Sequence, residues 1–280
     1  MTFTYKIPQF RKNEARVLVN TGDNSTKCMK KDRNSPKDTF DFTLVTWHVP
    51  LNSPDYFMYG QRQLNEEEKE ARIFEIISTY QKNLNHPLIK SVYIVTEQWE
   101  SVHFLQHIDF SNSSKLVLVL SENGVKAIDM FSFISMCLQG EIAMLTNSDI
   151  SIGEGFEKIN PESMREKKIM YALTRHATWN SHGVCEYEKF NGNADSFLFY
   201  VRNFTSTDFK QLSVITQNNP GIENVIIYMF REDLGFNVSN PCKILKTYHQ
   251  HQVQARNKKG KRVNQVGKNS ASAKITDQLL

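Results

Sequence analysis

A chain of 280 residues is long enough for one substantial α/β domain or for two small ones. Hydrophobic residues make up 40% of the sequence and aromatic residues 11%, which excludes wholesale disorder. The net charge of +4 indicates no particular partner. No segment has the roughly 18 consecutive apolar residues of a membrane-spanning helix, and residues 1–10 lack the apolar block of a signal peptide. We therefore expect a cytoplasmic protein; the alternative is a lumenal domain without its anchor.

The cysteines are widely spaced and form no C-x-x-C pair, so a zinc cluster is not expected and a disulfide framework is left open. Cys137 lies in an apolar, helix-like pattern and is interpreted as a core residue. Asn-x-Ser/Thr sequons would matter only in a secretory protein, and they occur at Asn24, Asn112, Asn203 and Asn237. Because Asn237 precedes a predicted core strand, we interpret that sequon as a chance match.

The N-terminal part of the chain begins with a polar segment. Residues 1–37 are rich in turn-forming clusters, which predicts a flexible arm. Residues 40–47 are rich in β-branched and aromatic side chains and predict the first strand. A helix follows, because Asn65 and Glu68 form a capping-box pattern and apolar residues recur at helical spacing over 73–84.

The middle of the chain alternates strands with a helix. Residues 91–97 and 115–120 predict two strands. Residues 125–138 have a helical pattern that ends at Gly140. A further strand is expected at residues 141–145.

The second half contains more strands for each helix. Residues 170–174 and 196–201 predict strands, and residues 221–234 predict a helix. Extended segments are expected at 236–238 and 244–249. The whole pattern predicts an α/β fold, a three-layer α/β/α arrangement around a central, mostly parallel, mixed sheet.

A single domain is expected from residue 38 to residue 252. Residues 253–280 carry a cluster of lysines and arginines followed by small polar residues, which predicts a basic, disordered tail. Such a tail can also bind nucleic acid, although nucleic acid is not the expected partner.

The segment after the strand at 141–145 is the most informative site in the sequence. In open α/β sheets, ligands bind outside the carboxyl ends of the strands. Asp149 follows that strand with Asn147 two residues before it, and carboxylate and carbonyl oxygens are the ligands that Mg²⁺ and Mn²⁺ prefer. The alternative is ordinary turn chemistry, for which Asn, Ser and Asp are also favoured.

The run LTNSDI resembles the N-x-D variant of the D-x-D motif of GT-A-type, nucleotide-sugar-dependent glycosyltransferases. Other segments resemble parts of the same family in the same order along most of the chain: FTLVTW, NLNHPLIKSVYIVTE, MYALTRH, ADSFLF, PGIENVIIYMF and NPCKILKTYHQH. The resemblance implies the GT-A fold and a nucleoside diphosphate sugar as donor.

The resemblance implies a role for each matching residue. Asp149 would bind a Mn²⁺ or Mg²⁺ ion that bridges the donor diphosphate, with Asn147 beside it. His249 or His251 would supply a late contact to the metal or to a phosphate. Since residues i and i+2 of a strand face the same side, both histidines can reach the site. The alternative for the histidines is a polar strand end.

Two acidic residues are the candidate catalytic bases. In the family that the sequence resembles, an acidic residue at the start of a helix is the base, and Glu223 stands at the matching position, where many members carry Asp. Glu is also simply favoured in a first helical turn. Asp195 precedes an apolar strand and could orient an acceptor hydroxyl, or it could merely flank the strand.

Four cationic residues are candidate phosphate contacts, because cations neutralise a departing diphosphate. Arg62 and Lys126 are the first pair, and Arg175 and His176 follow a predicted strand. Any of them can equally be an ordinary surface residue. Trp47, Trp99 and Trp179 could stack on a base or a sugar, with buried packing the favoured role for Trp47.

The expected activity is transfer of a hexosyl or N-acetylhexosaminyl group to a hydroxyl on a carbohydrate or other acceptor. Two alternatives stay open. One is a catalytically degenerate relative that binds a nucleotide-sugar or glycan. The other is an interaction module whose basic tail binds nucleic acid.

Overall fold

The computed structural model describes residues 15–20, 28, 40–48, 64–121, 126–177, 185, 194–213, 215, 221–250, 253 and 270–280. The strands of the main sheet are β1 (Arg16–Asn20), β2 (Phe42–Trp47), β3 (Ile89–Thr96), β4 (Leu116–Ser121), β5 (Ile142–Thr146), β7 (Ile169–Leu173), β8 (Ser196–Tyr200) and β9 (Asn237–Ser239). A second, two-stranded sheet pairs β6 (Ile150–Ile152) with β10 (Thr247–His249).

The α-helices are α2 (Glu66–Asn85), α3 (Trp99–Gln106), α4 (Ala127–Cys137), α5 (Pro161–Glu166) and α6 (Ile222–Tyr228). The 3₁₀-helices are η1 (Ser113–Lys115), η2 (Phe156–Lys158) and η3 (Ser206–Leu212), and the π-helical η4 (Met229–Asp233) continues α6. The capping box expected at Asn65 and Glu68 is present and begins α2.

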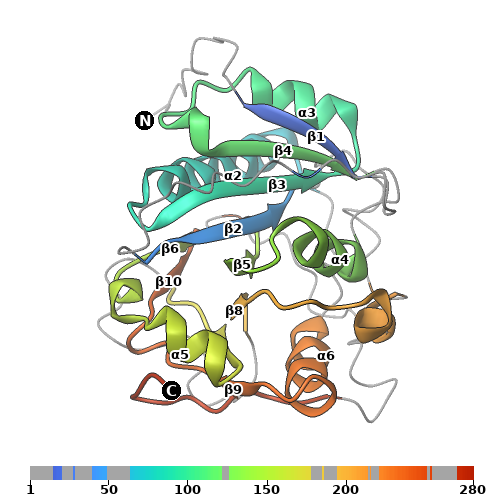
Figure 1. Ribbon diagram of the computed structural model, residues 1–280. Helices are drawn as coiled ribbons and strands as arrows, with labels where there is room; N and C mark the ends of the chain where they lie inside the picture. The colour runs from blue at the N-terminus through green and yellow to red at the C-terminus, as the bar shows by residue number, and fades with distance from the viewer. Residues whose placement is uncertain are drawn as a thin grey trace.

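The main sheet has the strand order β1-β4-β3-β2-β5-β8-β7-β9 (Figure 1). Every described pair is parallel except the two that β8 makes with β5 and β7. The expected fold class is therefore confirmed: an α/β fold with a mixed, mostly parallel sheet. Because β8 runs against its neighbours, its first residue lies at the edge where β5 and β7 end.

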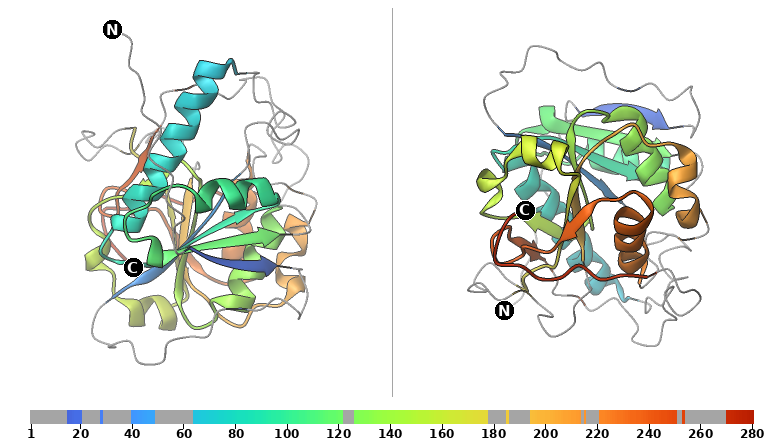
Figure 2. Two further views of the ribbon diagram at one scale, coloured as in Figure 1. Left: turned by 90° about the horizontal axis from the view of Figure 1, so that it is seen from above. Right: turned by 60° about the horizontal axis from the view of Figure 1, so that its bottom comes forward.

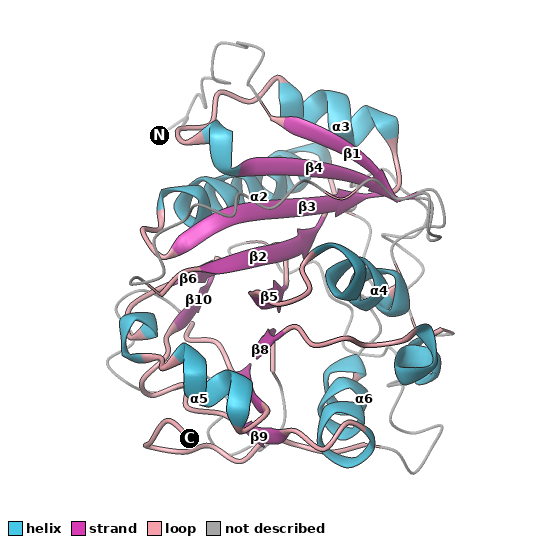
Figure 3. Cartoon of the chain, in the orientation of Figure 1, coloured by secondary structure: helices cyan, strands magenta, loops and turns pink. Residues whose placement is uncertain are grey.

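The sheet separates two hydrophobic cores, and side chains alternate between them along each strand. On β2, Val45 faces the core formed with α4, η3 and α6, whereas Leu44 faces the core formed with α2, α3 and α5. Helices flank the strands in Figure 3. Strands buried on both faces explain the near-continuous apolar runs in the sequence.

Both ends of the chain depart from the sequence interpretation. Within the arm expected at residues 1–37, Arg16–Asn20 form β1, which pairs in parallel with β4 at the edge of the sheet. Within the tail expected at 253–280, residues 270–280 pack beside β9 and α6 (Figure 2). Ala271 is buried there and exchanges hydrogen bonds with Asn224. The apolar residues of 270–280 thus complete a core that composition alone did not indicate.

Cys137 is not merely a core residue, because it forms a disulfide with Cys28. A second disulfide joins Cys185 to Cys242. Only the end of the segment 244–249 is a strand, β10, since Ile244 and Leu245 both donate backbone hydrogen bonds to Pro241 in a preceding turn. None of the helices in the described ranges is both long and apolar enough to cross a membrane.

Candidate functional site

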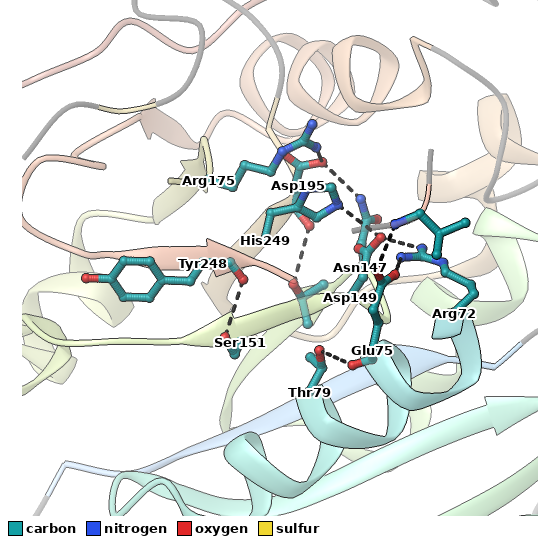
Figure 4. Close-up of polar contacts among 12 residues, drawn as sticks. Arg72, Glu75, Thr79, Asn147, Asp149, Ser151, Arg175, Asp195, Tyr248 and His249 are labelled. Carbon is teal, nitrogen blue, oxygen red and sulfur yellow. Dashed lines mark hydrogen bonds and ion pairs between the residues drawn. The ribbon is translucent and has the colours of Figure 1, made fainter. Parts of the chain in front are cut away.

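Polar residues from three strands meet at one edge of the sheet. Asn147 and Asp149 follow the carboxyl end of β5, Arg175 follows that of β7, and Asp195 immediately precedes the antiparallel β8. Figure 4 shows their side chains together with Arg72 of α2 and His249 of β10. The position matches the edge at which open α/β sheets bind ligands.

Asp149 is the centre of the first cluster. Its Oδ2 accepts a hydrogen bond from Arg72 Nη2 at 2.5 Å and lies 3.0 Å from His249 Nε2. Asp149 is 8% exposed. Burial alone would raise the pKa of its carboxyl group, but the charges of His249 and Arg72 and their hydrogen bonds outweigh it and hold the pKa well below its usual range. Asp149 is therefore ionised near neutral pH.

Arg72 was not among the residues singled out from the sequence. It lies between two buried carboxylates, since its Nη1 also donates to Glu75 Oε2 at 2.8 Å. The other oxygen of Glu75 accepts from the backbone N–H of Val253 at 2.9 Å. Arg72 therefore links the two buried carboxylates, and Asp149 also contacts His249.

The loop that carries Asp149 is held by α2 and by β10. Asn83 of α2 donates to the backbone oxygen of Ile150 at 3.0 Å and accepts from the N–H of Ile152 at 2.9 Å, so its amide acts as a strand partner for β6. From the other side, the N–H of Gln250 donates to the backbone oxygen of Asp149 at 2.9 Å. These bonds fix Asp149 beside His249.

A second cluster surrounds Asp195, which is 9% exposed. Its Oδ1 accepts from Arg175 Nη1 at 2.7 Å and from Asn147 Nδ2 at 3.0 Å. Its Oδ2 is buried and has no hydrogen-bond partner among the described residues. Such an orphaned carboxylate oxygen is costly unless a ligand or water satisfies it. Asn147 joins this cluster to the first one, because it lies two residues before Asp149.

The histidines behave differently from one another. His249 contacts Asp149, whereas His251 lies outside the described residues. His176 is fully buried, and its backbone accepts from the N–H of His249 at 2.9 Å. His176 therefore positions β10 through its backbone.

The described residues contain no cluster of three or more His, Cys, Asp or Glu side chains with the geometry of a metal site. Asp149 and His249 are residue types that bind divalent ions, but here Oδ2 and Nε2 contact each other directly at 3.0 Å. A divalent ion bound by both side chains would replace this contact. A carboxylate with an imidazole suits Mn²⁺ better than Mg²⁺, and substrate phosphates and water would complete the coordination.

The remaining predicted residues belong to other elements or lie outside the described residues. Glu223 is in the first turn of α6, where its Oε2 accepts from the N–H of Gly221 at 3.0 Å. Lys126 is exposed before α4, beyond the carboxyl end of β4. Because β3 and β2 separate β4 from β5, the two strands lie roughly 14 Å apart along the sheet. Arg62 lies outside the described residues.

Of the three tryptophans that could stack on a base or a sugar, the two that the structure describes differ in their exposure. Trp47 is 5% exposed and packs in the core at the end of β2, as favoured from the sequence, whereas Trp99 is 48% exposed on α3. Trp179 lies outside the described residues.

Comparisons with protein-family models and with curated proteins give no match. Among solved structures, residues 1–349 of S. aureus TarS align over 75% of this chain and 60% of that chain, with 11% identity and a TM-score of 0.43. A Desulfovibrio desulfuricans protein described as a nucleotide-diphospho-sugar transferase aligns over 72% of this chain and 80% of that one, with 8% identity and a TM-score of 0.42. At these values neither family nor activity follows from the likeness, so the functional proposal rests on the site.

Proposed function

We propose that this chain is a GT-A-type glycosyltransferase that moves a hexosyl or N-acetylhexosaminyl group from a nucleoside diphosphate donor to a hydroxyl acceptor. The observation that carries the proposal is the convergence of two buried carboxylates, Asp149 and Asp195, each paired with cationic side chains, at the carboxyl edge of a mostly parallel sheet. The sequence resemblance around LTNSDI supports the same assignment.

The Asp149 cluster is the proposed donor side. A Mn²⁺ or Mg²⁺ ion held there by Asp149 and His249 would supply Lewis-acid neutralisation of the diphosphate. Arg72 keeps Asp149 ionised and ready to hold a cation, and it fixes the carboxylate in place. Asn83 of α2 holds the backbone that follows Asp149 in place, so the donor would bind to a preorganised site.

The Asp195 cluster is the proposed acceptor side. The orphaned Oδ2 of Asp195 can accept a hydrogen bond from the acceptor hydroxyl, while Arg175 and Asn147 hold the other oxygen. In the transfer, the bond from the anomeric carbon to the diphosphate breaks and a bond to the acceptor oxygen forms. The hydroxyl proton passes to a carboxylate, for which Asp195 is the first candidate and Glu223 the second.

The proposal is tested by calorimetric titration of UDP and of GDP, each with and without Mn²⁺, into wild type and Asp149→Asn. We expect binding of at least one nucleotide that strengthens with Mn²⁺ and is lost in Asp149→Asn. The matched control is Asp109→Asn, an exposed aspartate between α3 and β4, which should bind like wild type. No binding by the folded wild type, or equal binding by Asp149→Asn, would contradict the assignment.

A further inference from the structure

All four cysteines of the chain are used in the two disulfides, Cys28–Cys137 and Cys185–Cys242. The Cα–Cα distances, 5.1 and 6.0 Å, lie within the range that disulfides require. Three of these cysteines are buried, with exposed fractions of 8% for Cys137, 1% for Cys185 and 0% for Cys242. Buried, paired cysteines of this kind are typical of structural disulfides.

The pairing also bears on where the chain folds. The partners are 109 and 57 residues apart in sequence, so each bond joins segments that meet only in the folded domain. Disulfides of this kind form and persist in oxidising compartments and are rare in the cytosol. Forming them removes two electrons and two protons from each thiol pair, and the disulfide-donating proteins of an oxidising compartment accept both.

In such a compartment the Asn-x-Ser/Thr sequons are candidate sites of N-linked glycosylation. The structure distinguishes among them. Asn203 is exposed on irregular chain after β8, and Thr205, which completes its sequon, is exposed as well. Asn237 lies within β9, its amide donates to the backbone oxygen of Lys167 at 2.7 Å, and the hydroxyl-bearing Ser239 is buried. Asn112 is exposed in a turn, with its amide donating to Asn85 at 2.8 Å.

We propose that this domain folds in an oxidising, secretory-type compartment and carries an N-linked glycan on Asn203. The co-reactant is an oligosaccharide joined through a diphosphate to a lipid. The Asn203 Nδ2 forms a bond to the anomeric carbon, the bond from that carbon to the lipid diphosphate breaks, and the amide loses one proton. The proposal differs from the cytoplasmic location expected from the sequence and is independent of the proposed activity.

The position of Asn203 is compatible with the candidate site. Asp195 precedes β8 and Asn203 follows it, so the two lie beyond opposite ends of the same strand. A glycan on Asn203 therefore extends from the edge of the sheet away from Asp149 and Asp195. The modification would cover surface without obstructing a donor or acceptor.

The test uses the full chain purified from the cells that naturally make it. The protein is denatured, alkylated without reduction, treated with peptide-N-glycosidase F, which converts a glycosylated asparagine to aspartate, and mapped by mass spectrometry. We expect no alkylated cysteine, conversion at Asn203 and no conversion at Asn237. Alkylation of all four cysteines would contradict folding in an oxidising compartment. An unconverted Asn203 would contradict the proposed glycosylation.

Variants at Thr205 separate glycosylation from folding. Thr205→Ser keeps the sequon and the hydroxyl that contacts Asp208 at the start of η3, so the glycan should remain. Thr205→Ala and Asn203→Gln should each lose one glycan, seen as an equal increase in mobility on a denaturing gel. A Thr205→Ala protein that still carries the glycan would contradict the assignment.

Discussion

Replacement of Arg72 by methionine tests the electrostatic organisation of the site. Arg72 is the cation shared by Asp149 and Glu75, and the three side chains are 10%, 11% and 4% exposed. Methionine preserves much of the apolar stem but removes the charge, which leaves two buried carboxylates without their common partner.

The expected cost follows from what each carboxylate retains. Removing one partner of a buried ion pair costs about 3–5 kcal/mol. After the substitution Asp149 keeps the contact with His249, and Glu75 keeps the hydrogen bond from the N–H of Val253. We therefore expect Arg72→Met to lower the free energy of unfolding by about 3 kcal/mol.

The assay is urea unfolding followed by tryptophan fluorescence, with the disulfides kept intact. The double variant Arg72→Met/Glu75→Gln removes the uncompensated charge but keeps an acceptor for Val253, so it should regain about 2 kcal/mol. Lys69→Met is the control: it breaks an ion pair with Glu66, which is 86% exposed, and should cost less than about 0.5 kcal/mol. A double variant no more stable than Arg72→Met would refute the reasoning.

Three further predictions concern stability and can be measured by the same unfolding assay. Burial lowers the pKa of His48 from 6.5 to about 4, so the unfolded state binds more protons between these values and stability should fall as pH drops from 6.5 toward 4. His48→Gln should remove up to about 3 kcal/mol of this pH dependence, and an unchanged profile would contradict it. Gly155→Ala places a Cβ 1.8 Å from a backbone oxygen at a φ of +99° and should cost more than about 3 kcal/mol, whereas Gly235→Ala, with nothing within 4 Å, should cost about 1 kcal/mol; similar costs would refute the clash. Asn83→Leu leaves two buried backbone groups of β6 unpaired and should cost about 2–4 kcal/mol, so a neutral effect would show that Asn83 does not hold the strand.

The elements of the fold could be predicted where a local pattern determines them. The capping box at Asn65, the apolar strands and the helix at residues 222–233 follow from hydrophobic spacing and from cap chemistry. β1 could not be predicted from its five residues, because its strand character depends on pairing with β4. The disulfides likewise depend on tertiary proximity, which cysteine spacing does not encode.

The site was predictable only in part. Asp149 follows a strongly apolar strand, so its place at the carboxyl edge could be inferred. Arg72 was missed because the apolar residues of α2 suggested a different buried face: Phe74 is 55% exposed, whereas Arg72 and Glu75 are buried. The overlooked signal is a polar stripe at helical spacing, formed by Arg72, Glu75, Thr79 and Asn83.

The central claim is that the edge of the sheet at Asp149 binds a nucleoside diphosphate sugar and catalyses its transfer. Turnover of such donors tests this claim most directly. The measurement is release of nucleoside diphosphate from a panel of UDP- and GDP-sugars, with a mixed set of hydroxyl acceptors and Mn²⁺. We predict that wild type consumes at least one donor and that Asp149→Asn slows this reaction by about 100-fold or more, the scale at which a lost charge-stabilising contact acts. Undiminished turnover by Asp149→Asn, or no consumption of any donor by folded wild type, would contradict the account.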